Sequence, residues 1–221
     1  MSNPYLHLPN PRWYTLVRSF VRFAVWLLTR TTIRGLENLP PCGPYIVVTN
    51  HLSAIDPPLI LASIPTRITV FAADTHRHEF IVGGLMNALG AIWVRRGEVD
   101  REALRSALDV LKAGGVIGMA PEGTRSRTGG LLEGKIGAAY LANRADVPLI
   151  PAVLAGTEVG LPSVLRLTRP RLTVTLGKPF CLPGANPRAD RQQLLAHTEL
   201  IMRTLAAMLP EKLRGVYRDC V

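Results

Sequence analysis

Residues 45–57 read YIVVTNHLSAIDP, and this stretch passes from a strand through a turn into a helix. The segment 45–49 is short, apolar and rich in β-branched residues, which is typical of a buried strand. Asp56 precedes two prolines, and proline favours the first turn of a helix because its missing N–H needs no partner there. Asp56 is therefore the expected N-cap of a helix, and residues 51–55 form the turn that leads into it.

The same pattern continues along the chain. Short β-branched runs alternate with segments of helical periodicity, and this alternation predicts an α/β fold. We expect a single domain with a mixed, mostly parallel sheet flanked by helices. The predicted strands are 45–49, 68–72, 91–94, 115–120, 149–154 and 171–177, and the predicted helices are 57–64, 79–89, 100–113, 134–145 and 189–209. Pro151 inside a predicted strand indicates an edge strand or a bulge.

Composition and charge restrict the class of protein. The chain has 221 residues, 48% of them hydrophobic, which is enough for one domain with a substantial core. Its three cysteines are scattered, which favours a reducing compartment over a disulfide framework. The net charge is +10, and residues 1–36 and 159–189 each contain five basic residues and no acidic one. Such basic blocks indicate an anionic partner, either nucleic acid or an acidic membrane surface.

The N-terminal segment 12–34 combines arginines with large apolar residues. The uncharged run between Arg22 and Arg30 has only seven residues, far short of the roughly 20 that cross a bilayer. At helical spacing, one face contains Trp13, Val17, Phe20, Val21, Ala24, Leu27 and Leu28, and the other contains Arg18, Arg22 and Arg30.

This pattern predicts an amphipathic helix on an anionic membrane surface. We expect peripheral or monotopic residence on the cytoplasmic side of the cell membrane. The expected organisation is an N-terminal membrane-associating segment, 1–36, followed by an α/β domain, 37–221. The alternative is a helix that packs its apolar stripe on its own domain.

The spacing of His51 and Asp56 restricts how their side chains can meet. On one continuous helix, residues five apart point about 140° apart, and on an extended chain they lie about 17 Å apart. The predicted turn between them allows the carboxylate to orient the imidazole, so that His51 acts as a general base. The alternative is a capping aspartate beside an unrelated surface histidine.

Two later stretches place basic residues after predicted strands. GAIWVRRG (90–97) puts Arg96 beside glycines, where a guanidinium can point into a crevice. In APEGTRSRTGG (120–130), Gly123 lets backbone N–H groups approach a ligand closely, and Arg125 can donate two hydrogen bonds to a phosphate. Taken alone, Arg96 is better explained as an ordinary solvated side chain.

Taken in order, four stretches resemble the four sequence blocks of the glycerolipid acyltransferase family, whose best-known members are the lysophosphatidate acyltransferases. They are NHLSAIDP (50–57), GAIWVRRG (90–97), PEGTRS (121–126) and VPLIPAVL (147–154). The resemblance implies a single α/β domain with an apolar acyl tunnel. It also implies that His51 deprotonates the acceptor hydroxyl while Asp56 holds the imidazole, with direct transfer from a thioester and no covalent acyl-enzyme. The substrate-binding residues that it implies are Arg96 and Arg125 on the phosphate, Glu122 and Gly123 in the pocket floor, and also Thr124 and Lys135.

The expected reaction moves a fatty acyl group to the free hydroxyl of 1-acyl-sn-glycerol-3-phosphate and gives phosphatidate, in phospholipid biosynthesis. Acyl-CoA or an acyl-carrier protein would be the co-substrate, and we expect no cofactor. The alternatives are another acceptor, either glycerol-3-phosphate or another lysophospholipid, and a non-catalytic phospholipid-binding module. RNA binding is a third class, but the chain has no recognisable nucleic-acid motif, so we expect no nucleic-acid partner.

The segment FAADTHRHEF (71–80) departs from the family pattern, because relatives often carry a lysine between the first two blocks. Either the acceptor differs, or Arg77 substitutes for that lysine. His76, His78 and Glu79 are also possible metal ligands. Two histidines separated by one residue more often belong to a polar loop, so we expect no metal.

Overall fold

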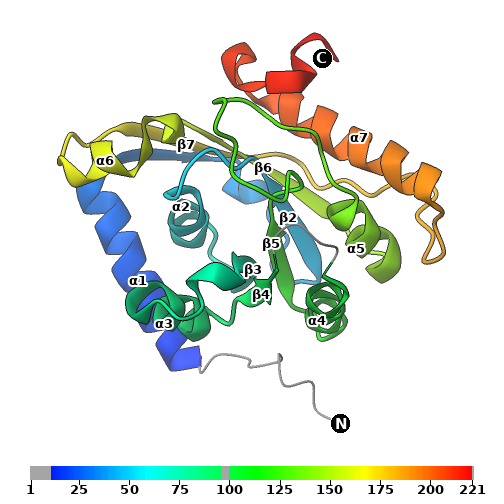
Figure 1. Ribbon diagram of the computed structural model, residues 1–221, viewed down its shortest axis with the longest axis horizontal. Helices are drawn as coiled ribbons and strands as arrows, with labels where there is room; N and C mark the ends of the chain where they lie inside the picture. The colour runs from blue at the N-terminus through cyan, green and yellow to red at the C-terminus, as the bar shows by residue number, and fades with distance from the viewer. Residues whose placement is uncertain (1–10, 96–99, 221) are drawn as a thin grey trace.

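The computed structural model describes residues 11–95 and 100–220, and among these residues seven strands form one sheet flanked by helices (Figure 1). The strands are β1 (Arg30–Arg34), β2 (Tyr45–Thr49), β3 (Ile68–Ala73), β4 (Ile92–Val94), β5 (Val116–Met119), β6 (Leu149–Ala155) and β7 (Arg171–Leu176). The α-helices are α1 (Pro11–Leu28), α2 (Asp56–Ser63), α3 (Phe80–Leu89), α4 (Arg101–Lys112), α5 (Gly137–Ala145), α6 (Gly160–Leu165) and α7 (Arg191–Met208). Short 3-10 helices are η1 (Leu36–Asn38), η2 (Asp74–His76), η3 (Thr157–Val159), η4 (Glu211–Leu213) and η5 (Gly215–Cys220).

The sheet is mixed and mostly parallel, as the sequence predicts. Its strand order is β1-β7-β6-β2-β5-β3-β4. The five strands from β6 to β4 run parallel, β7 is antiparallel to β6, and β1 is parallel to β7. The carboxyl ends of β2, β3, β4, β5 and β6 therefore lie at one edge of the sheet, which is where α/β proteins bind ligands.

Helices cover both faces of the sheet, and β2 shows why its sequence is apolar throughout. Ile46 and Val48 point into a core formed with α4, α5 and α7, whereas Tyr45 and Val47 point into a second core with α1, α2 and α3. Successive side chains of a strand point to opposite faces, so a strand buried on both faces has no polar alternation. Figure 1 shows the two helix layers on either side of the sheet.

Pro151 lies in β6, between β7 and β2, so the edge-strand interpretation is wrong, and the bulge interpretation stays a prediction. Leu149 pairs with Phe180 and Ala152 pairs with Leu176, so a three-residue advance along β6 lies opposite a four-residue advance along the segment 176–180. The carbonyl of Pro151 accepts from the N–H of Gly177 at 2.8 Å inside this irregular segment. The missing N–H of the proline falls where regular pairing with β7 has ended, so the ladder tolerates it.

α1 has two apolar faces, so the predicted division of its faces is only partly right. Tyr14 and Val21 are buried, and the helix packs against α2 and α3. Arg18, predicted on the solvent side, lies beside this packed face and donates from Nε to the carbonyl of Leu61 at 3.1 Å. The outer face exposes Trp13, Leu16, Phe20, Phe23, Trp26 and Leu27.

Two elements were not predicted. Residues 30–34, assigned from the sequence to the N-terminal segment, form β1, whose register partners are on β7. The strand is short and carries arginines at both ends, so its sequence lacks the apolar character of a buried strand. Residues 160–165 form α6, which is too short for a periodic signal. No helix among the described residues combines the length and apolar character needed to cross a membrane.

Candidate active site

Two loops at the carboxyl edge of the sheet form the site. β2 leads into His51, and the neighbouring parallel strand β5 leads into Pro121, Glu122 and Gly123. The loops are joined by backbone hydrogen bonding, because the N–H of Ser126 donates to the carbonyl of His51 at 2.7 Å. His51 and Ser126, which are 75 positions apart in the chain, are thereby placed side by side.

His51 and Asp56 are in direct contact. His51 Nδ1 lies 2.9 Å from Asp56 Oδ2, and the same oxygen accepts from the backbone N–H groups of Leu52 and Ser53, each at 2.6 Å. Because the carboxylate accepts, Nδ1 carries the proton and Nε2 keeps its lone pair. The Asp56 side chain is 3% exposed and that of His51 is 21% exposed. The pair therefore presents a fixed basic nitrogen near solvent.

The predicted N-cap role of Asp56 is wrong in detail. Asp56 is the first residue of α2, Ile55 occupies the cap position, and the carboxylate accepts from the turn that precedes the helix. The two N–H groups of that turn have no strand or helix partner, so the carboxylate satisfies them while it holds the imidazole. Asp56 Oδ1 is buried and makes no hydrogen bond.

Glu122 anchors the backbone of the histidine from the other loop. Its Oε1 accepts from the His51 N–H at 2.9 Å, and its Oε2 accepts from the Leu132 N–H at 2.9 Å. The side chain is almost fully buried. Burial raises the pKa of Glu122, and the two backbone donors and nearby His51 partly oppose that rise. Glu122 therefore fixes the backbone of His51. The role predicted from the sequence, shaping a pocket floor, stays a prediction.

Gly123 and Lys135 lie against each other. Gly123 has φ +65°, a left-handed conformation that favours glycine, and a Cβ built there would lie 2.9 Å from Lys135 Cδ and 3.2 Å from Lys135 Nζ. The Lys135 N–H also donates to the carbonyl of Pro121 at 2.8 Å. Glycine at position 123 thus allows the exposed ammonium of Lys135 to lie over the loop.

The remaining predicted residues are Thr124, Arg125 and Arg96. Thr124 is half-buried and Arg125 is exposed, and both follow Gly123 on the loop whose next residue, Ser126, contacts His51. Arg96 lies outside the described residues. Its predicted role in binding phosphate stays a prediction.

Comparison with known proteins identifies the family. A profile described as Acyltransferase matches residues 30–155, more than half of the chain. The chain belongs to the Acyltransferase family. The predicted resemblance is confirmed, and the matched segment of this acyltransferase chain contains both loops of the site.

Individual relatives agree with this placement. Over 148 residues the acyltransferase chain is 26% identical to the 1-acyl-sn-glycerol-3-phosphate acyltransferase of Borreliella burgdorferi, covering 66% of this chain and 59% of that protein. Over 132 residues it is 32% identical to the 1-acyl-sn-glycerol-3-phosphate acyltransferase alpha of Mus musculus, covering 58% and 46%. The chain spans about half the length of the curated relatives that it matches.

A solved structure has the same fold. The crystal structure of the 1-acyl-sn-glycerophosphate (LPA) acyltransferase PlsC from Thermotoga maritima superimposes with a TM-score of 0.67 at 25% sequence identity. The superposition covers 88% of the acyltransferase chain and 79% of the Thermotoga chain. The predicted fold class is therefore confirmed.

A polar cleft of about 220 Å³ lies farther along the same edge, at the carboxyl ends of β3 and β4. Its lining residues carry both signs of charge and include Asp74, Arg77, Trp93, Arg95 and Asp100. The cleft does not include His51, so we do not identify it with the reacting centre. Arg77 Nη1 lies 3.7 Å from Asp74 Oδ1, and its predicted substitution for the family lysine stays a prediction.

The segment with two histidines forms η2 and a turn, and His78 and Glu79 are exposed. Among the residues described, no three His, Cys, Asp or Glu side chains gather as metal ligands do. The assignment of this segment to a polar loop without a metal stays a prediction.

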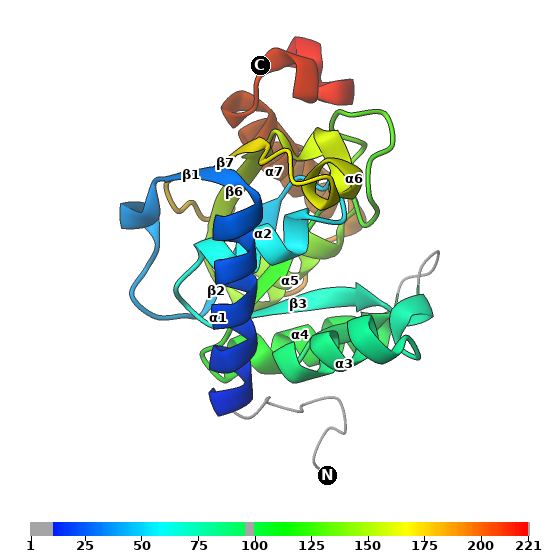
Figure 2. The same ribbon diagram turned by 90° about the vertical axis from the view of Figure 1, so that its left-hand side faces the viewer.

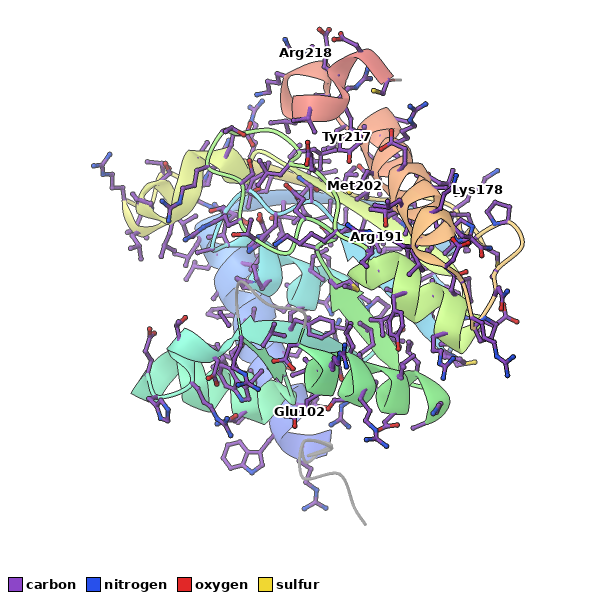
Figure 3. All side chains as sticks on the ribbon, turned by 45° about the vertical axis from the view of Figure 1, so that its right-hand side comes forward. Glu102, Lys178, Arg191, Met202, Tyr217 and Arg218 are labelled. Atoms are coloured by element: carbon purple, nitrogen blue, oxygen red, sulfur yellow. The ribbon has the colours of Figure 1, made fainter. Side chains whose placement is uncertain are left out.

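The C-terminal segment supports the site from outside, which sequence reasoning missed. The Tyr217 hydroxyl accepts from the Gly134 N–H at 3.2 Å, and Leu131 exchanges backbone hydrogen bonds with Leu213 and Val216. Figure 3 shows Tyr217 on the side of the C-terminal turn that faces this loop. The loop carries Leu132, which donates to Glu122, so the C-terminus is connected to His51 through three hydrogen bonds. No sequence motif marks Tyr217 or the backbone contacts of Leu131 for this role.

Proposed function

We propose that this chain transfers a fatty acyl group from an acyl thioester to the free hydroxyl of 1-acyl-sn-glycerol-3-phosphate, giving phosphatidate. The observation that carries the proposal is the His51–Asp56 contact, which leaves Nε2 as a base at the ligand-binding edge of the sheet. The family and the names of the relatives support the same reaction class.

In the proposed reaction, the acceptor hydroxyl gives its proton to His51 Nε2 while its oxygen attacks the thioester carbonyl carbon. The resulting imidazolium is stabilised by the carboxylate of Asp56. When the tetrahedral adduct collapses, the carbon–sulfur bond breaks and the imidazolium returns the proton to the leaving thiolate. No covalent acyl-enzyme forms, and the histidine ends in its starting state.

The proposed binding of the acceptor places its phosphate on the basic groups beside the base. Lys135 lies over Gly123, and Arg125 is on the same exposed loop. Charge-assisted hydrogen bonds from such groups each contribute about 1.5–3 kcal/mol. Arg96, which follows β4 in the sequence, is proposed to bind the same phosphate. Acyl-CoA or an acyl-carrier protein is the proposed donor.

We further propose peripheral or monotopic residence on the cytoplasmic face of an anionic membrane. The outer face of α1 exposes six large apolar side chains, and Arg12 and Arg22 are exposed beside them. This combination is typical of helices that lie in a lipid headgroup layer. The three exposed free cysteines are consistent with a reducing compartment.

The test offers the purified protein labelled acyl-CoA with lysophosphatidate, glycerol-3-phosphate or other lysophospholipids, and compares wild type with His51→Ala. We expect phosphatidate as the main product and a loss of turnover of about 10²- to 10⁴-fold in the variant. A different main product would reassign the acceptor. Equal turnover in both proteins would overturn the mechanism, and binding without any product would indicate a phospholipid-binding module.

A further inference from the structure

The segment 159–171, which we call the α6 turn, exposes leucines at the same edge of the sheet as the site. Leu161, Leu165 and Leu167 are 43%, 69% and 68% exposed. The α6 turn follows β6, and β6 runs parallel to β2, which leads into His51. The exposed leucines and the reacting histidine therefore belong to the same end of the molecule.

The backbone of the α6 turn holds these leucines outward in an uncommon conformation. Leu167 has φ +57° and Arg169 has φ +49°, and residues other than glycine rarely adopt this left-handed backbone conformation. The conformation is fixed by hydrogen bonds from Leu167 N–H to the Val164 carbonyl at 3.0 Å and from Thr168 Oγ1 to the Ser163 carbonyl at 2.8 Å. Strained backbone that keeps a large apolar side chain in solvent is typical of functional surfaces.

The α6 turn is fixed to the end of α1. Arg169 Nη2 donates to the carbonyl of Trp26 at 3.3 Å, and the Arg30 N–H donates to the carbonyl of Pro170 at 2.9 Å. Figure 1 and Figure 2 both show α6 beside the C-terminal end of α1. The leucines of the α6 turn thus belong to a segment that is fixed to the end of α1 where Trp26 and Leu27 are exposed.

The charge of this surface indicates what covers it. Arg166, Arg169 and Arg171 are all exposed on the α6 turn, and residues 159–189 contain no acidic residue. Leucines surrounded by arginines suit a lipid surface with negative headgroups, because the apolar tips enter the acyl boundary while the guanidinium groups remain among the phosphates.

We propose that the α6 turn is a second membrane-contact element, which inserts Leu165 and Leu167 into the surface of an anionic bilayer. With α1 it gives the protein two fixed points of contact, and these points turn the edge that carries His51 toward the lipid. The proposal rests on the proposed surface residence of α1 and does not depend on which acyl acceptor is used.

The experiment measures partitioning of the full-length protein onto vesicles of phosphatidylcholine with phosphatidylglycerol. Leu165→Ser with Leu167→Ser should weaken partitioning about tenfold, and Leu165→Trp should strengthen it. Arg166→Ser should weaken it about fivefold on these vesicles and have no effect on pure phosphatidylcholine. The matched control is Leu195→Ser with Val216→Ser, which changes two side chains that are 50% and 58% exposed on α7 and η5.

The outcomes separate this proposal from the proposed reaction. The proposed membrane contact of the α6 turn would be overturned if the Leu165→Ser, Leu167→Ser variant bound vesicles as strongly as wild type. An equal loss of binding in the Leu195→Ser, Val216→Ser control would also overturn it. If Arg166→Ser weakened binding of an acidic carrier protein and left vesicle binding unchanged, a protein partner would replace the lipid surface. Acyl transfer to an acceptor in detergent micelles should be the same in the leucine pair and wild type. Absence of transfer in wild type would refute the reaction and leave the vesicle result to decide the α6 contact.

Discussion

The carboxylate of Glu122 joins the two loops of the site, with Oε1 2.9 Å from the His51 backbone nitrogen and Oε2 2.9 Å from that of Leu132. Glu122 is buried and acts through the backbone of the histidine. It is therefore a positioning residue, and its ionisation state affects how firmly the two loops are held.

Glu122→Gln tests this role through the pH dependence of stability. Because burial raises the pKa of Glu122, the folded chain binds this proton more tightly than the unfolded chain does. Above the unfolded value of about 4.3, the contribution of Glu122 to the free energy of unfolding falls as pH rises, until the folded group has also ionised. Urea unfolding of both proteins should show wild type losing stability relative to the variant through this window. A relative gain with rising pH would contradict the burial argument.

Asp56→Asn tests the electrostatic role of the carboxylate. An amide oxygen can replace Oδ2 as acceptor for the His51, Leu52 and Ser53 donors, so the geometry is largely kept. The negative charge that stabilises the imidazolium is lost, and kcat should fall about 10²- to 10⁴-fold. Steady-state kinetics measure the loss, and thermal unfolding confirms that the variant is folded. A kcat within threefold of wild type would show that the charge is not needed.

The sequence predicts most of the fold because the buried elements carry strong patterns. β2, β5 and β6 are almost entirely apolar, and at all six ends their predicted limits differ from the observed ones by no more than one residue. β1 was not predicted because it contains Arg30 and Arg34 and is stabilised by pairing with β7. Its order depends on a partner about 140 residues away, and local patterns carry no such information.

The candidate site was predictable where two groups are close in sequence. The turn between His51 and Asp56 follows from the prolines after Asp56, although its hydrogen bonds differ from those of an N-cap. The contacts of Glu122 with His51 and of Tyr217 with Gly134 join segments 71 and 83 residues apart. Such contacts are set by sheet order and by the path of the C-terminus, which the sequence does not display.

Tyr217→Phe tests the support from the C-terminus. The change removes the hydroxyl that accepts from the Gly134 N–H and leaves that N–H without this partner. The expected loss in the free energy of unfolding is about 1 kcal/mol, measured by urea denaturation, with a smaller effect on kcat. Tyr140→Phe, on α5, is the matched control and should have little effect. Equal losses in the two variants would mean that the hydroxyl of Tyr217 has no special role.

Asn50→Ala tests the residue that fixes β2 to β6 just before the histidine. Asn50 Nδ2 donates to the Leu154 carbonyl at 2.9 Å, and the Leu154 N–H donates to Asn50 Oδ1 at 2.8 Å. Removing both bonds leaves two buried backbone groups unpaired, which should cost about 2–4 kcal/mol of unfolding free energy. Asn38→Ala removes a single bond to the Leu176 carbonyl and should cost less. Urea unfolding measures both losses, and a loss in Asn38→Ala as large as that in Asn50→Ala would contradict this role of Asn50.

Gly123→Ala tests whether Lys135 helps to bind the acceptor. An alanine Cβ at this position would lie 2.9 Å from Lys135 Cδ, so the lysine must move away from the loop. Gly129 is the matched control, because its φ of +80° carries the same left-handed strain while a Cβ there would meet nothing within 4 Å.

Each variant should lose about 1–2 kcal/mol of stability from the left-handed backbone, but only Gly123→Ala should raise the KM for a phosphate-bearing acceptor. Steady-state kinetics with lysophosphatidate measure this difference. Adding Lys135→Ala to Gly123→Ala should cause little further loss, because the alanine has already displaced the ammonium. If Gly129→Ala raised KM equally, strain in the loop would explain the effect, and Lys135 would have no part in binding the phosphate.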